Sequence, residues 1–84
     1  MLEISRFYGI SIKMYFSQVE NNPPHVHAIY GKYTGEFDLT SMQLTRGFLP
    51  IKAQDLVLEW AKEHEDELMN MWDSQIFKKI KPLE

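Results

Sequence analysis

The strongest constraint on the fold is the dipeptide Gly31-Lys32, which separates two runs of alternating apolar and polar residues. Glycine beside a polar residue is typical of two-residue β-hairpin turns, because one position needs a positive φ. A turn of this length fixes which residues face each other across the hairpin. The predicted cross-strand pairs are Tyr30 with Tyr33, Ala28 with Gly35, His27 with Glu36, Val26 with Phe37, and His25 with Asp38.

Side chains alternate between the two faces of a strand, so this register also predicts a buried face. Val26, Ala28 and Tyr30 form the more apolar set, which leaves His25 and His27 on the open face. Two further features extend the sheet: an alternating run at 9–16, and Thr40-Ser41, which reads as a second tight turn. The second turn predicts Leu39 with Met42, Phe37 with Leu44, Asp38 with Gln43, and Glu36 with Thr45.

The last third of the chain has helical periodicity. Pro50 suits a first helical turn, and apolar residues then recur every three to four positions up to Ile76. A single rod over 51–77 would be about 40 Å long, more than a small sheet requires. The acidic triplet at 65–67 is typical of a helix first turn, so we expect a bend or restart near His64.

These elements predict an α+β fold: an antiparallel sheet of about four strands in meander order, with C-terminal helix packed across one face. The stretch 2–7 is either an edge strand or an arm. The length of 84 residues with 44% hydrophobic content predicts a single domain over 1–84.

Composition narrows the classes of function. The chain has no cysteine, which excludes disulfides, thiolate zinc sites and cysteine nucleophiles and is compatible with a reducing cytosol. No apolar run approaches the roughly 20 residues of a membrane span, so we expect a cytoplasmic protein without membrane contact. Residues 51–77 carry two basic and seven acidic side chains, which argues against broad phosphate-backbone binding but not against RNA at a small local site.

The pair His25 and His27 allows three interpretations. Two imidazoles at i and i+2 on one strand face, with Glu36 across the hairpin, form a candidate site for zinc, manganese or nickel with an open position. Without metal, the histidines could act as general base and acid on RNA, with Lys13 or Arg6 stabilising the charged transition state.

The third interpretation is a polar face of histidine-carboxylate pairs that binds another protein or nothing. Such pairing predicts that both histidines titrate above about 6.5 unless metal or burial intervenes. His64 lies on the apolar helix stripe and is expected to be a satisfied core histidine, and Trp60 and Trp72 are expected in the core.

Several sequence motifs are similar to those of a known protein family. They are Ile4-Ser5-Arg6-Phe7-Tyr8-Gly9-Ile10, Asn22-Pro23-Pro24-His25-Val26-His27-Ala28 with Tyr30-Gly31, Gly47-Phe48-Leu49-Pro50, and Leu58-Glu59-Trp60-Ala61. The chain thereby resembles the bacterial domain of unknown function 4160. That family has no established activity, and its members often look like partners of a small protein encoded by a neighbouring gene. Asn21 departs from the resemblance, because family members commonly carry a third histidine there, and a metal site built from it would lose one ligand.

The resemblance, the small size and the acidic helix together predict a protein-binding component of a two-gene, toxin-antitoxin-like bacterial module. The alternative is a small RNA-cleaving enzyme, metal-dependent or metal-free, that uses His25, His27, Glu36, Lys13 and Arg6. No organic cofactor is expected. The sequence leaves open whether the protein is catalytic.

Overall fold

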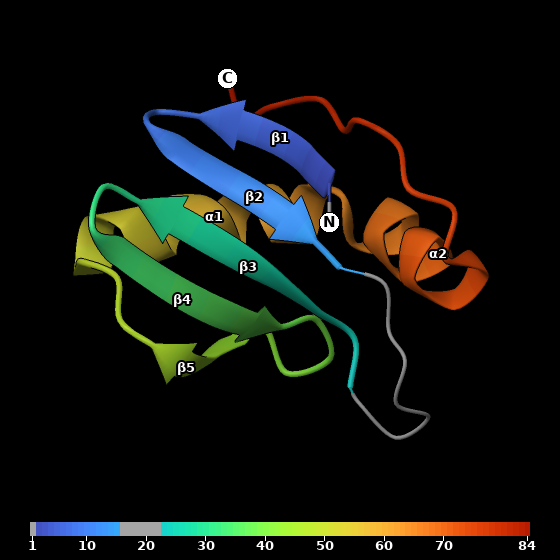
Figure 1. The fold of residues 1–84 in the computed structure, drawn as a ribbon, viewed down its shortest axis with the longest axis horizontal. Coiled ribbons are helices and arrows are strands. Elements are labelled where there is room, and N and C mark those ends of the chain that lie inside the picture. The colour runs from blue at the N-terminus through green and yellow to red at the C-terminus, as the bar shows by residue number, and fades with distance from the viewer. Residues whose placement is uncertain (1, 16–22) are drawn as a thin grey trace.

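The computed structural model describes residues 2–15 and 23–84, and shows a five-stranded antiparallel sheet followed by two helices (Figure 1). The strands are β1 Leu2–Phe7, β2 Ile10–Met14, β3 His25–Tyr30, β4 Tyr33–Asp38 and β5 Gln43–Gly47, and the helices are α1 Ile51–Glu63 and α2 Glu65–Ser74. The strand order β1-β2-β3-β4-β5 is a meander, which confirms the predicted α+β class. The stretch 2–7 is a strand paired with β2, so the sheet has five strands rather than about four. Phe16 and Asn21 lie outside the described residues.

The register of the β3–β4 hairpin is the predicted one. All the expected pairs are present, from Tyr30 opposite Tyr33 to His25 opposite Asp38. Gly31 has a φ of 60°, the positive value that the turn requires. The periodic alternation and the turn chemistry therefore sufficed to fix the faces of both strands.

The β4–β5 connection differs from the predicted two-residue turn. Residues 39–42 link the strands, and Met42 takes a positive φ of 57°. Phe37 opposite Leu44 and Asp38 opposite Gln43 are confirmed, whereas the predicted ladder pair of Leu39 with Met42 is not formed. A bulge between Glu36 and Phe37 then sets Glu36 opposite Arg46, so its predicted pairing with Thr45 is wrong.

Helix α1 packs against the predicted apolar face of the sheet and forms one hydrophobic core with it (Figure 1). Val26 and Ala28 from β3 are fully buried, as is Trp60 from α1, whose ring lies 5.5 Å from that of Phe7. Leu68 and Met71 extend the core into α2. Burial of these apolar surfaces is the dominant favourable term in folding a domain of this size.

The expected break in the helix occurs at His64. This residue has φ −118° and ψ 24°, and its N–H reaches back to the carbonyls of Trp60 and Ala61. All three acidic residues of the triplet 65–67 stand in the first turn of α2, where they complement the helix dipole.

The C-terminal segment covers the outer edge of β1, which the sequence did not indicate (Figure 1). The N–H of Ile80 donates to the carbonyl of Ile4 at 2.7 Å, and the indole Nε1 of Trp60 donates to the carbonyl of Lys81 at 2.9 Å. Ile80 and Leu83 are buried. An otherwise unpaired strand edge is thereby protected.

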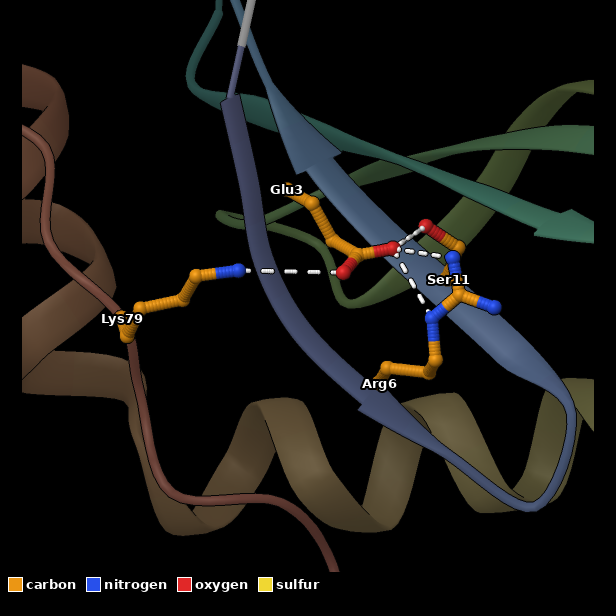
Figure 2. Close-up of polar contacts among 4 residues, drawn as sticks. All are labelled: Glu3, Arg6, Ser11 and Lys79. Atoms are coloured by element: carbon orange, nitrogen blue, oxygen red, sulfur yellow. Dashed lines mark hydrogen bonds and ion pairs between the residues drawn. The ribbon is translucent and has the colours of Figure 1, made fainter.

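A polar network on β1 reinforces the contact between this strand and the C-terminal segment. Figure 2 shows the Glu3 carboxylate, which accepts hydrogen bonds from Arg6 and Ser11 and lies 3.7 Å from the Lys79 ammonium. The hydrogen bonds from Arg6 and Ser11 and the charges of Arg6 and Lys79 lower the pKa of Glu3 to about 2, although partial burial opposes the shift. Among the described residues, no helix is long and apolar enough to cross a membrane.

Candidate metal centre

The two imidazoles and the Glu36 carboxylate converge on one point of the open sheet face. The Nε2 atom of His25 lies 3.6 Å from Oε1 of Glu36, and the Nε2 atom of His27 lies 3.1 Å from the same oxygen. One ligand atom from each of the three residues falls within 4.8 Å of the others. The alternation of β3 and the hairpin register produce this cluster, so the sequence identified its members correctly.

The tautomer of His25 follows from its second ring nitrogen. Nδ1 lies 2.9 Å from the carbonyl oxygen of Pro23. A carbonyl only accepts, so Nδ1 must carry the proton and donate it. In the neutral ring the lone pair is then on Nε2, which faces the Glu36 carboxylate, and a cation between these two acceptors would satisfy both.

His27 is partly buried, and this burial disfavours its charged form. Burial lowers the pKa of His27 below 6.5, with the neighbouring His25 acting in the same direction and Glu36 opposing both. Pairing with Glu36 predicts a raised pKa unless burial intervenes, and at His27 burial does intervene, because desolvation of the charged form outweighs the carboxylate. Its Nδ1 atom is buried and has no hydrogen-bond partner among residues 2–15 and 23–84.

Aromatic rings hold both imidazoles in place. The ring of Tyr15 stands edge-on to that of His27 at 4.7 Å, and the ring of Trp72 lies 5.0 Å from that of His25. Trp72 is half-buried and belongs to α2, so helix α2 also reaches the histidine face of the sheet, which was expected to be open. These contacts restrict the rings to the orientation in which their Nε2 atoms converge.

Asp38 does not serve as the partner of His25, although the backbone register sets the two residues opposite each other. Its Oδ1 atom accepts hydrogen bonds from the N–H groups of Thr40 and Ser41, at 2.7 and 3.0 Å. The carboxylate therefore stabilises the β4–β5 connection, and His25 faces Glu36 instead. A register predicts proximity, but competing backbone donors decide where a short aspartate side chain points.

Arg46 joins the site although the sequence did not indicate it. The β-bulge brings it opposite Glu36, where its Nε lies 3.9 Å from Oε2. Arg46 and the His25 ring line an open cavity of about 270 Å³ beside the cluster. The Arg46 side chain is 84% exposed, so its guanidinium can turn toward an anion bound there.

The two predicted catalytic cations differ in their positions. Lys13 on β2 lies opposite His27 and on the same face, and no ion pair links it to an acidic residue within 2–15 and 23–84. Arg6 is engaged with Glu3 at 2.7 Å (Figure 2). It lies on β1, which β2 separates from the histidines of β3. His64 pairs instead with Glu67 at 3.0 Å, as expected for a satisfied histidine outside the cluster.

The geometry fits a four-coordinate divalent ion. Metal bonds of about 2.0 to 2.2 Å set the ligand atoms of a tetrahedral site about 3.4 Å apart. The two Nε2 to Oε1 distances, 3.6 and 3.1 Å, bracket that value. Three protein ligands leave the fourth position open to water, and the Pro23 carbonyl provides the outer hydrogen bond that metal-bound histidines usually make.

The fold and this site define a small α+β domain with a histidine-carboxylate cluster on one sheet face. Residues 9–73 match the family described as Domain of unknown function (DUF4160), and the chain belongs to that family. The comparisons with curated proteins and with solved structures gave no match.

Proposed function

We propose that the protein binds a divalent transition metal ion through His25, His27 and Glu36 and uses it to hydrolyse phosphodiesters, with RNA as the candidate substrate. The observation that carries this proposal is the convergence of both Nε2 atoms on one carboxylate oxygen. A bound divalent ion would supply a nucleophilic water or hydroxide near neutral pH and would polarise a phosphoryl oxygen.

The same convergence favours metal-dependent over metal-free cleavage. A general acid and a general base act on different atoms of the scissile bond and need room between them for substrate. Here both imidazoles point at Glu36, whose negative charge repels a phosphate unless a cation intervenes. The metal-free alternative is therefore the weaker proposal.

The surrounding side chains have separate roles in this proposal. His27 is kept neutral by burial, which preserves its lone pair for the ion. Arg46 and Lys13 flank the cluster and would contact the anionic oxygens of a substrate. Arg6 is assigned no role, because it is bound to Glu3.

The test is cleavage of a labelled single-stranded RNA by tag-free protein with zinc, manganese or nickel, and with a chelator. We expect metal-dependent cleavage that is lost in His25→Gln and Glu36→Gln but retained in His64→Gln, since His64 pairs with Glu67 outside the cluster. Cleavage that persists in chelator would move the chemistry to the metal-free alternative. Metal binding without any cleavage would remove RNA hydrolysis and leave a metal-binding protein.

A second proposal is that the protein is the protein-binding component of a toxin-antitoxin-like module of two bacterial genes, acting in the cytoplasm. Membership of the family and the small size support it, as do the large apolar side chains exposed at the surface. Co-purification with the product of the adjacent gene tests it, and a protein that stays alone at micromolar concentration would count against it.

A further inference from the structure

Four large apolar side chains are exposed at one end of the sheet, away from the histidine cluster. Tyr8 is 60% exposed, Tyr30 38%, Phe48 57% and Ile51 72%. They come from the β1–β2 turn, the end of β3, the β5–α1 connection and the start of α1, which lie together on the left of Figure 1. We call this set the aromatic end.

Packing contacts link Tyr30 and Phe48 within the aromatic end, and Ile51 follows Phe48 by three residues in the chain. The ring of Tyr30 lies over Gly9, where an added Cβ would be 3.5 Å from it, so Tyr30 borders the turn that carries Tyr8. Tyr30 also pairs across the hairpin with Tyr33, whose ring lies 5.4 Å from that of Phe48. Contiguous exposed apolar surface of this kind marks interaction sites, whereas singly scattered apolar residues do not.

Tyr8 is held in this position at a conformational cost. Its φ is 49°, and with Gly9 at 79° it forms a two-residue turn that asparagine or glycine would adopt with less strain. Left-handed backbone is unusual for a bulky side chain. Strained backbone of this kind clusters at functional sites.

Two lysines lie beside the aromatic end. Lys32 lies 5.5 Å above the Tyr33 ring, and Lys52 is exposed next to Ile51. Neither lysine forms an ion pair with an acidic residue in the part of the chain that the structure describes. The first turn of α1 also has no acidic residue. An occupant of this surface therefore needs apolar side chains flanked by carboxylates.

We propose that the aromatic end is a docking surface for a short acidic, apolar segment of another protein. Tyr8, Tyr30, Phe48 and Ile51 would bury the apolar side chains, and Lys32 and Lys52 would face the carboxylates. A protein segment fits better than nucleic acid, because Ile51 offers no stacking plane, and a chain of net charge −3 with two free lysines here is a poor electrostatic match for a phosphate backbone. This surface is separate from the metal cluster. The inference rests on the protein-binding proposal above and specifies the chemistry of the partner segment.

The test is selection of a displayed library of random 12-residue peptides on the immobilised full chain. We expect an enriched consensus of Asp or Glu with Leu, Ile, Phe or Trp. Phe48→Ser and Ile51→Ser should each weaken binding of the selected peptide at least about tenfold, since truncation at the centre of an interface has effects of this size. Ile76→Ser is the matched control, because Ile76 is 74% exposed and outside the aromatic end, and it should leave binding unchanged.

Two further variants separate docking from folding. Tyr8→Asn should weaken peptide binding while raising the melting temperature, since it relieves the strained turn. The double variant Lys32→Glu, Lys52→Glu should lose the acidic peptides. No consensus, a basic consensus, binding that survives Phe48→Ser, self-association through this surface, or preferential binding of a labelled 12-nucleotide RNA would each overturn the proposal. None of these outcomes depends on metal, so metal binding is judged independently.

Discussion

His27 in the candidate metal centre should make the stability of the fold depend on pH. The unfolded chain binds a proton at His27 more readily than the folded chain does, because burial lowers the folded pKa below 6.5. The free energy of unfolding should therefore fall as pH drops below about 6.5 toward the folded pKa. In the presence of a chelator we predict an NMR titration of His27 below 6.5.

Glu36→Gln should lower the pKa of His27 further, because the Glu36 charge and hydrogen bond raise it. His64→Gln should leave the titration unchanged, since His64 is paired with Glu67. A His27 that titrates above 6.5, or that does not respond to Glu36→Gln, would contradict the assigned geometry.

Tyr8 carries a prediction about stability. Replacing it by asparagine should raise the free energy of unfolding by about 1 kcal/mol, because left-handed backbone costs a bulky residue about that much. The side chain is 60% exposed, so little buried surface is lost. Urea denaturation measures the change, and a less stable Tyr8→Asn protein would show that the ring contributes more to packing than the turn costs.

The sequence predicted three residues of the cluster and did not predict Arg46 beside it. His25, His27 and Glu36 follow from alternation and a two-residue turn, which are local properties. The position of Arg46 depends on a β-bulge, and the orientation of the Asp38 side chain depends on two backbone N–H donors. A periodic sequence pattern reveals neither the bulge nor these hydrogen bonds. The lowered pKa of His27 depends on burial, which needs the folded surroundings.

The β4–β5 hairpin is the element on which the position of Arg46 depends. Gly47 takes a φ of 78°, and a Cβ there would lie 2.1 Å from the carbonyl oxygen of Thr34. We predict that Gly47→Ala lowers the free energy of unfolding by at least about 2 kcal/mol, because the new atom clashes with backbone and the conformation is strained.

Gly31→Ala is the matched control for that variant. Gly31 also has a positive φ, 60°, but a Cβ there would have nothing within 4 Å. It should cost about 1 kcal/mol, which reflects backbone conformation alone. Equal losses in urea denaturation of the two variants would show that the Thr34 contact does not hold the hairpin.

The contact between β1 and the C-terminal segment should be sensitive to acid. Glu3 has a folded pKa of about 2 against an ordinary value of 4.5. A depressed carboxyl pKa stabilises the fold above the unfolded value, and that stabilisation is lost as pH falls from about 4.5 toward 2. Glu3→Gln should therefore be less stable than the parent at pH 7, with a difference that shrinks across this range. A constant difference in thermal unfolding from pH 7 to pH 2 would contradict the role of Glu3.

Periodic elements were predictable, and the segment after α2 was not. The β3–β4 hairpin and the break at His64 follow from residue spacing and from the acidic triplet of the α2 first turn. Residues 75–84 have no regular period, and Ile80 is buried where its N–H bonds to the Ile4 carbonyl on the open edge of β1. Tertiary context alone defines that contact.

The domain has two surfaces with different chemistry. The sheet face opposite α1 carries the His25, His27 and Glu36 cluster, and the aromatic end carries exposed apolar side chains with lysines. Because α2 places Trp72 against His25, the second helix also supports the cluster. Ion binding at the cluster would stabilise the folded state by about 2.7 kcal/mol at a free metal concentration one hundred times the dissociation constant.

Calorimetric titration of tag-free, chelator-treated protein with zinc, manganese or nickel tests whether His25, His27 and Glu36 bind a metal ion. The parent protein and His64→Gln should each bind about one equivalent, with a rise in melting temperature, and Glu36→Gln and His27→Gln should lose both. Histidine ring ¹⁵N shifts should locate the ion at Nε2 of His25 and His27. Binding of less than about a tenth of an equivalent of every metal, with no thermal shift, would contradict metal binding at these residues.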